Sequence, residues 1–159
     1  MIINLYAIII MAFTHQDTEC MTLALKLSQF GRKAVGANPM VGCVISRDDK
    51  IIAQDYHRLY GKGHAEVNAL EKINYKGGNT NVYITLEPCT HFGKTPPCAD
   101  ALIRAGVKKV FIAMLDPNPL VSGSGVRALQ DNGIEVEVGL LEEEANKINR
   151  GFVKRMTSG

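Results

Sequence analysis

Short apolar runs alternate with amphipathic segments along most of the chain. Runs rich in β-branched and other apolar residues predict five strands, at residues 41–45, 51–57, 82–86, 107–114 and 134–138. Helical spacing of apolar positions predicts five helices, at residues 17–30, 64–76, 97–105, 126–130 and 142–154. Asp17 or Thr18 is expected to cap the first helix, and Gly31 to end it.

The order of these elements predicts an α/β fold. The first two strands flank the turn residues 47–50 and form a hairpin. After the hairpin, strands alternate with helices, which requires crossover connections and a largely parallel sheet covered on both faces. Ligands of such sheets bind beyond the carboxyl ends of the strands, and His64 and Cys89 follow the second and third strands. We therefore expect the functional site at this edge of the sheet.

Size and charge favour one domain that acts on a small molecule. The 159 residues, 46% of them hydrophobic and 21% charged, can bury one core but would be cramped as two complete domains. The net charge is +2 and the basic residues are dispersed, so no nucleic-acid-binding surface is evident. We therefore expect no nucleic-acid partner, although charge alone does not exclude a polynucleotide substrate.

An apolar run of 13 residues precedes the patterned part of the chain. It is too short to cross a bilayer, which takes roughly 20 apolar residues, and it lacks the basic start and cleavage site of a secretory signal. We interpret residues 1–16 as a non-catalytic N-terminal extension and expect no membrane partner. An extra strand or packing arm, and membrane attachment, are the alternatives for residues 1–13.

Three residues with metal-binding side chains stand in one motif with a carboxylate. His64-Ala65-Glu66 is followed downstream by Pro88-Cys89 and then by Cys98. Imidazole and thiolate suit Zn²⁺, and a catalytic zinc site uses three protein ligands so that water can hold the fourth position. H-x-E followed by P-C-x-x-C is the signature of zinc-dependent nucleobase deaminases, in which the glutamate moves protons. Here eight residues, rather than two, separate Cys89 from Cys98.

The other two cysteines, Cys20 and Cys43, fall in apolar helical and strand patterns, so we expect them to be core residues. The metal-binding context of Cys89 and Cys98 argues against disulfides and for a reducing compartment, so we expect a cytoplasmic protein. A metal that only stabilises the fold is the alternative for this site. Such sites are usually closed by four ligands, and the motif offers three.

Five further motifs accompany the metal-binding residues. They are Asn38-Pro39-Met40-Val41-Gly42, Tyr56-His57, the cysteine loop 86–98, Asp116-Pro117-Asn118-Pro119 and Asn149-Arg150-Gly151-Phe152. With these motifs, residues 17–156 resemble the deaminase domain of the bifunctional deaminase/reductase family of riboflavin biosynthesis. The long cysteine loop is the specific feature, because many pyrimidine and purine deaminases share the shorter form. Small departures from the family pattern, at Gly63, Thr90, Phe92 and Ala99, remove no ligand.

The resemblance implies a three-layer α-β-α cytidine deaminase-like fold with a five-stranded mixed sheet. In that family a reductase domain that uses NADPH follows the deaminase domain, so residues 157–159 would be the tail where it begins. We expect residues 17–156 to be the deaminase domain, either excised or standalone, without reductase activity. We also expect a homo-oligomer, which the missing reductase domain could mediate.

The resemblance also implies a reaction in riboflavin biosynthesis. The substrate is 2,5-diamino-6-(5-phosphoribosylamino)pyrimidin-4(3H)-one, whose ring amino group is hydrolysed to give 5-amino-6-(5-phosphoribosylamino)uracil and ammonia. Zinc bound by His64, Cys89 and Cys98 would activate water near neutral pH, and Glu66 would be the general acid/base. The spacer between the cysteines gives its side chains room to reach a sugar phosphate. The residues expected to contact the substrate are Asn38, His57, His91, Lys94, Thr95, Asp116 and Asn118.

Most of these contact assignments have a structural alternative. His57 and His91 could be hydrogen-bonded histidines at a strand or loop end, and Lys94 could be a solvated loop lysine. Asn38 and the stretch 116–119 could supply only turns.

One glycine-rich motif points to a different ligand. Residues 123–128 match the dinucleotide fingerprint G-x-G-x-x-G/A, but they do not follow a strand directly. We therefore predict a glycine-rich helix start and no NADPH site. Two rival functions stay open: a nucleobase, nucleoside or tRNA deaminase with the same mechanism, which the cysteine spacing disfavours, and a zinc-stabilised binding module, which Glu66 disfavours.

Overall fold

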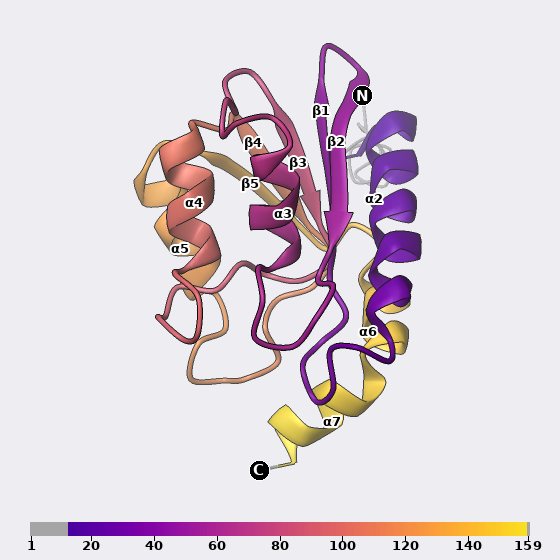
Figure 1. Cartoon of the computed structure of the whole chain (residues 1–159). Coiled ribbons are helices and arrows are strands. Elements are labelled where there is room, and N and C mark those ends of the chain that lie inside the picture. The colour runs from indigo at the N-terminus through magenta and orange to yellow at the C-terminus, as the bar shows by residue number, and fades with distance from the viewer. Residues whose placement is uncertain (1–12, 159) are drawn as a thin grey trace, which may run out of the picture.

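The computed structural model describes residues 13–158, in which five strands form one sheet in the order β2-β1-β3-β4-β5 (Figure 1). The strands are β1 (Gly42–Arg47), β2 (Lys50–Tyr56), β3 (Asn81–Ile84), β4 (Lys109–Ile112) and β5 (Glu135–Val138). Strand β1 runs antiparallel to β2 and β3, whereas β3, β4 and β5 are parallel. The predicted five-stranded mixed sheet is therefore confirmed.

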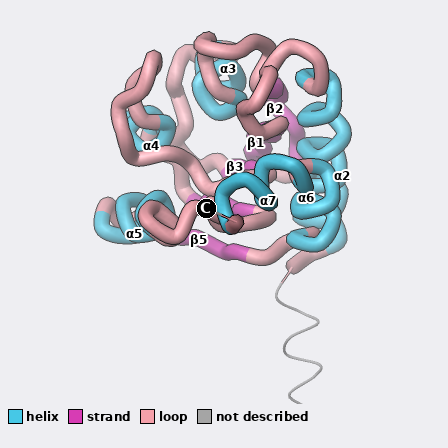
Figure 2. The backbone as a smooth tube through the Cα atoms, turned by 90° about the horizontal axis from the view of Figure 1, so that it is seen from below, coloured by secondary structure: helices cyan, strands magenta, loops and turns pink. Residues whose placement is uncertain are grey.

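Helices cover both faces of the sheet (Figure 2). One face carries α2 (His15–Ser28), which continues into the short 3-10 helix η1 (Gln29–Gly31), and α6 (Glu142–Ile148). The other face carries α3 (Ala65–Glu71), α4 (Cys98–Ala105) and α5 (Ser124–Asp131). Helix α7 (Arg150–Thr157) lies at one edge of this three-layer arrangement (Figure 1).

The first helix begins earlier than its pattern predicts. Its N-cap is Thr14, whose hydroxyl accepts the Asp17 N–H at 3.0 Å while the Asp17 carboxylate accepts the Thr14 N–H at 2.9 Å. This is a reciprocal capping box, so the prediction of Asp17 or Thr18 as the cap was wrong. The second carboxylate oxygen of Asp17 accepts the buried hydroxyl of Tyr83 at 2.7 Å, which ties the start of α2 to the sheet.

The last predicted helix is broken into two. A single helix was predicted over residues 142–154, but α6 ends at Ile148 and α7 begins at Arg150. Asn149 lies between them with φ −105° and ψ 26° and is 5% exposed. Its side chain is bonded to the backbone of Met40, a tertiary contact that helical periodicity cannot indicate.

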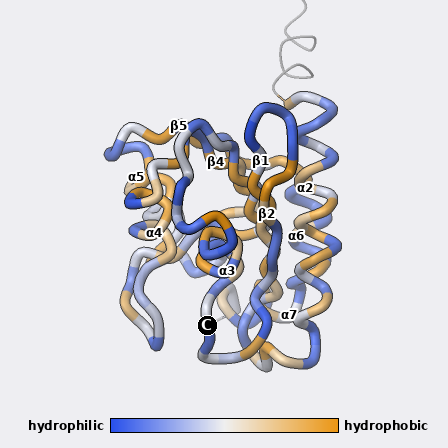
Figure 3. The backbone as a smooth tube through the Cα atoms, turned by 45° about the horizontal axis from the view of Figure 1, so that its top comes forward, coloured by the Kyte–Doolittle hydropathy of each residue, from blue (hydrophilic) through white to orange (hydrophobic). Residues whose placement is uncertain are grey.

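The core forms where the central strands meet the helices on both faces. The side chains of Val82, Tyr83 and Ile84 in β3 are almost fully buried in succession, as expected for a strand covered on both sides. Figure 3 shows hydrophobic colour along the body of the β1–β2 hairpin and a hydrophilic tip. Cys20 and Cys43 are 2% and 0% exposed within this core, as predicted.

The predicted extension lies mostly outside the described residues. Residues 1–12 are not described, so the interpretation of that segment and the boundary at residue 16 stay predictions. Between residues 13 and 158, no helix has both the length and the apolar character needed to cross a membrane.

Asp55 fixes the end of β2 against α3. This carboxylate is 4% exposed and lies 2.8 Å from Arg58 Nε and 3.0 Å from Lys72 Nζ. Burial by itself would raise the pKa of Asp55, but the hydrogen bonds from Arg58, the Tyr56 N–H and Lys72 lower it overall. Because Lys72 is the C-cap of α3, the carboxylate holds that helix in place beside the strand that leads to His57.

Candidate active site

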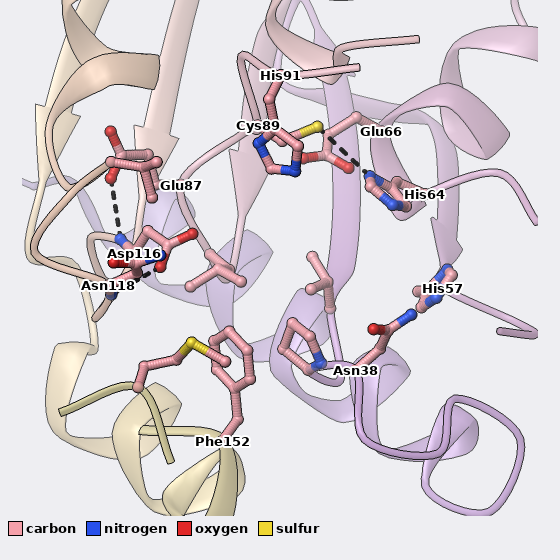
Figure 4. Close-up of a pocket in the computed structure, with 15 residues that line it drawn as sticks. Asn38, His57, His64, Glu66, Glu87, Cys89, His91, Asp116, Asn118 and Phe152 are labelled. Atoms are coloured by element: carbon pink, nitrogen blue, oxygen red, sulfur yellow. Dashed lines mark hydrogen bonds between the residues drawn. The ribbon is translucent and has the colours of Figure 1, made fainter. Parts of the chain in front are cut away.

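A cavity of about 310 Å³ lies at the carboxyl edge of the sheet, where the sequence predicted the site (Figure 4). Its walls come from the loops after β2, β3 and β4, from the segment before β1, and from α3 and α7. The predicted site residues that line it are Asn38, His57, His64, Glu66, Cys89, His91, Asp116 and Asn118.

Lys94 and Thr95 line a second cavity of about 190 Å³. The two cavities adjoin, because Asn38, His64, Cys89 and His91 line both. The Lys94 ammonium lies 4.3 Å from the ring centroid of Tyr60, a cation–π contact that holds the flexible side chain at this position. The predicted contact residues therefore divide into a larger chamber and a smaller basic side chamber.

The three predicted zinc ligands converge on one point between the chambers. His64 is the N-cap of α3, Cys98 is the first residue of α4, and Cys89 lies in the loop after β3. His64 Nδ1 is 3.0 Å from Cys98 Sγ and 3.7 Å from Cys89 Sγ, and all three ligand atoms lie within 4.8 Å of one another. A single ion can contact atoms so spaced, and within residues 13–158 no fourth His, Cys, Asp or Glu joins the group.

The surroundings of Cys89 favour the thiolate form that binds metals. A hydrogen bond from the Cys98 side chain lowers the pKa of Cys89 to about 4, and the same bond raises the pKa of Cys98. Cys89 Sγ also accepts the Cys98 backbone N–H at 3.3 Å, and Cys98 opens α4. Both sulfurs thus lie at the start of α4, where the helix dipole favours negative charge.

Glu66 lies beside the ligand group but outside it. The residue is 3% exposed, and its Oε2 atom is buried without a hydrogen-bond partner in the described part of the chain. Burial raises the pKa of Glu66. Because an unpartnered buried carboxylate oxygen is costly, its position next to three zinc-type ligands fits a metal that brings water within its reach.

His57 presents the second unpartnered buried atom of the site. Its Nδ1 lies 3.2 Å from the Gly63 carbonyl, so Nδ1 carries the proton and donates it. Burial lowers the pKa of His57, which favours the neutral ring. Its Nε2 is therefore a hydrogen-bond acceptor, and it has no partner among residues 13–158. The ring stands edge-on to His64 with 5.2 Å between the two centroids.

Glu87, which was not among the predicted site residues, organises the opposite wall. This carboxylate is 5% exposed and accepts four backbone N–H groups. One oxygen is bonded to Gly125 and Val126 at 2.9 and 3.3 Å, and the other to Asp116 and Gly123 at 2.9 and 3.1 Å. In the sequence, Glu87 directly follows an apolar strand pattern and belongs to the motif 86–98, but nothing there indicated its structural role.

The glycine-rich motif at residues 123–128 thus binds the protein's own carboxylate. Gly123 is the N-cap of α5, and the N–H groups at this helix start point to Glu87. A Cβ atom on Gly125 would lie 2.3 Å from the Pro88 carbonyl oxygen and 2.9 Å from Glu87 Cγ, so only glycine allows this close approach. The predicted glycine-rich helix start is confirmed.

The stretch after β4 both turns and lines the cavity. Asp116 Oδ1 accepts the Asn118 N–H at 2.9 Å, and Asn118 Oδ1 accepts the Leu120 N–H at 3.1 Å. Such side-chain-to-backbone bonds stabilise turns. They leave the second Asp116 oxygen and the Asn118 amide nitrogen without a bond in this turn. Burial raises the pKa of Asp116.

Comparison with known proteins agrees with this geometry. Residues 14–114 match the family described as the cytidine and deoxycytidylate deaminase zinc-binding region. The chain belongs to this deaminase family. The deaminase is therefore a zinc-binding hydrolase, as the sequence predicted.

Relatives of two lengths are similar to this deaminase. The diaminohydroxyphosphoribosylamino-pyrimidine deaminase of Buchnera aphidicola (subsp. Schizaphis graminum) is 51% identical over 91% of this chain and 98% of its own length. The riboflavin biosynthesis protein RibD of Escherichia coli is also 51% identical, but the match covers 39% of that protein. The solved structure of Acinetobacter baumannii RibD superposes with a TM-score of 0.88 and 48% identity, over 90% of this chain and 40% of that one. The predicted cytidine deaminase-like fold is confirmed.

Glu87→Gln should destabilise the deaminase, because an amide NH₂ group would face backbone N–H donors that a carboxylate now accepts. Hydrogen bonds to charged groups contribute about 1.5–3 kcal/mol, so we expect the free energy of unfolding to fall by about that amount. Urea unfolding monitored by circular dichroism measures it. Glu71→Gln, at an exposed position on α3, is the control. Equal stability of the two variants would show that the four bonds do not hold the wall.

Proposed function

We propose that the deaminase hydrolyses the ring amino group of 2,5-diamino-6-(5-phosphoribosylamino)pyrimidin-4(3H)-one in riboflavin biosynthesis. The observation that carries the proposal is the pair of adjoining chambers. The larger one is lined by Glu66 and by two of the zinc-type ligands, His64 and Cys89, and the smaller one is lined by Lys94. In a pyrimidine linked through ribose to a phosphate, the ring can occupy the larger chamber and the phosphate anion the smaller one. The names of the Buchnera and Escherichia coli relatives point to the same pathway.

We infer that His64, Cys89 and Cys98 hold the zinc ion, which when bound supplies Lewis-acid activation of water near neutral pH. Glu66 is placed to accept a proton from the attacking water and to deliver it to the ring nitrogen next to the reacting carbon. It then takes the remaining proton of the hydroxyl group added to that carbon and delivers it to the departing amine. A C–O bond forms, the C–N bond breaks, and ammonia leaves. The buried position of Glu66 suits this work, because a raised pKa brings a carboxyl group closer to the operating pH.

Ring recognition falls to polar groups on two sides of the larger chamber. His57 Nε2 can only accept a hydrogen bond, so we assign an N–H or O–H group of the substrate as its donor. Asp116 and Asn118 face it from across the chamber (Figure 4). Asn38 lies on the same side as His57, and His91 lies near Cys89 (Figure 4). These groups fix the orientation of a polar ring against Glu66.

Phosphate recognition falls to Lys94 and Thr95 in the smaller chamber. The competing anion site, the start of α5, already has its N–H groups bonded to Glu87. Lys94 is exposed, so its ammonium group is accessible to a phosphate, and its contact with the Tyr60 ring holds it in place.

We also propose the setting in which this reaction occurs. Residues 17–156 are the deaminase domain and residues 157–159 a tail. The enzyme acts in the cytoplasm as a homo-oligomer on a small molecule, without a nucleic-acid partner. The four cysteines of the described chain are free, in agreement with a reducing compartment.

Purified zinc-loaded protein should release ammonia from the phosphoribosylaminopyrimidine and far less from cytidine, guanine or tRNA. Glu66→Gln should abolish this turnover while keeping the metal, because the amide preserves shape but cannot carry the proton. General acid–base catalysis typically contributes about 10²–10⁴-fold, so we expect at least a 100-fold lower kcat. Zinc content by elemental analysis is the control. Near-parental turnover in Glu66→Gln, or preference for a base or tRNA, would contradict the proposal.

Lys94→Ala should reduce kcat/KM for the phosphorylated substrate much more than for its dephosphorylated nucleoside. A charge-assisted hydrogen bond contributes about 1.5–3 kcal/mol, which corresponds to roughly 10- to 150-fold. Steady-state ammonia release on both substrates measures the difference, and Lys50→Ala on the distant β1–β2 hairpin is the control. Equal losses on both substrates would mean that the phosphate binds elsewhere.

A further inference from the structure

The Asn149 side chain makes a two-bond clamp on a segment 109 residues away. Its Oδ1 accepts the Met40 N–H at 2.8 Å, and its Nδ2 donates to the Met40 carbonyl at 2.8 Å. The amide thus pairs with one residue of backbone as a neighbouring strand would. Because Asn149 is 5% exposed, breaking the clamp would leave polar groups with little access to water.

The clamped segment, residues 38–42, is already fixed at its other end. A Cβ atom on Gly42 would lie 1.9 Å from the Ala24 carbonyl oxygen, so α2 packs directly on this backbone. The Val41 carbonyl accepts the His57 N–H at 2.9 Å. Residues 38–40, which precede these contacts, are held to the C-terminal helices by the Asn149 clamp. A second attachment is a bond of 2.7 Å from Arg155 to the Ala37 carbonyl.

This same junction forms one end of the larger chamber. Asn38 and Pro39 line it from the clamped segment, and Phe152 and Met156 line it from α7. Figure 4 shows Phe152 on the side of the cavity away from Cys89 and His91, with Asn38 nearby. Asn149 lies at the α6–α7 break and does not itself line the chamber.

We propose that Asn149 is a positioning residue for substrate binding: by clamping Met40 it sets Asn38 and the α7 side chains at their spacing across the chamber. The clamp stands apart from the zinc-type ligands and Glu66. Its loss should therefore weaken the binding of substrate and leave the chemical step and the metal site in place. The kinetic part of this inference rests on the proposed function.

The test compares Asn149→Ala with Asn146→Ala in the full, zinc-loaded chain. Asn146 is the matched control, because its side chain bonds only to the Glu142 carbonyl on its own helix. We expect Asn149→Ala to raise KM for the phosphoribosylaminopyrimidine about 10-fold, with kcat within about 3-fold and full zinc content. Asn146→Ala should match the parent. An unchanged KM, or a loss confined to kcat, would overturn the proposal.

Two further measurements keep the test decisive. Amide hydrogen exchange at Met40 should accelerate in Asn149→Ala and not in Asn146→Ala, a result that needs no substrate; equal protection would show that the clamp does not hold the segment. Parental protein that leaves the pyrimidine unchanged would contradict the proposed function instead.

If Asn149→Ala does not fold, Arg155→Ala is the second variant, because it removes the other bond that holds this segment, the one to the Ala37 carbonyl. An unchanged KM in Arg155→Ala would overturn the proposal.

Discussion

Three ligand atoms from separate elements must meet at one point while a carboxylate stays buried beside them, and much of this structure serves that constraint. His64 and Cys98 are placed by the starts of α3 and α4, and Cys89 by the loop that leaves β3. Burying Glu66 with one oxygen unpartnered among the described residues is unfavourable, so the elements around it must hold it in place. Asp55, at the end of β2, holds α3 against the sheet and so limits how far His64 can move.

Two glutamates at the same edge of the sheet have opposite tasks because their surroundings differ. Glu87 accepts four backbone N–H groups, so its charge is satisfied within the protein and it serves as a fixed anchor. Glu66 has an oxygen without a partner among the residues that the structure describes, so it can exchange a proton with a bound molecule. The same contrast applies to the histidines, since His57 keeps a free acceptor atom and His64 faces two sulfurs.

Much of this arrangement could be predicted from the sequence, because apolar periodicity and motif spacing are local. The strands, the edge that carries the site and the convergence of His64, Cys89 and Cys98 follow from such patterns. An ideal helix would put Glu66 roughly 200° around the axis from His64, but His64 has an extended backbone with ψ 167°, which removes that restriction. The contacts that local patterns could not indicate join distant residues. Glu87 bonds to Gly125 across 38 positions, and Asn149, which breaks the predicted last helix, bonds to Met40 across 109.

Zinc K-edge X-ray absorption of the purified protein tests the central claim most directly, because it reports the metal's ligand types and distances without a substrate. The account predicts two sulfur ligands at about 2.3 Å and two nitrogen or oxygen ligands at about 2.0–2.1 Å, the second of these being exchangeable water. Cys89→Ser should remove one sulfur and Cys20→Ser none. A site with three or four sulfurs, or a parental spectrum without sulfur ligands, would contradict an open catalytic centre built from His64, Cys89 and Cys98.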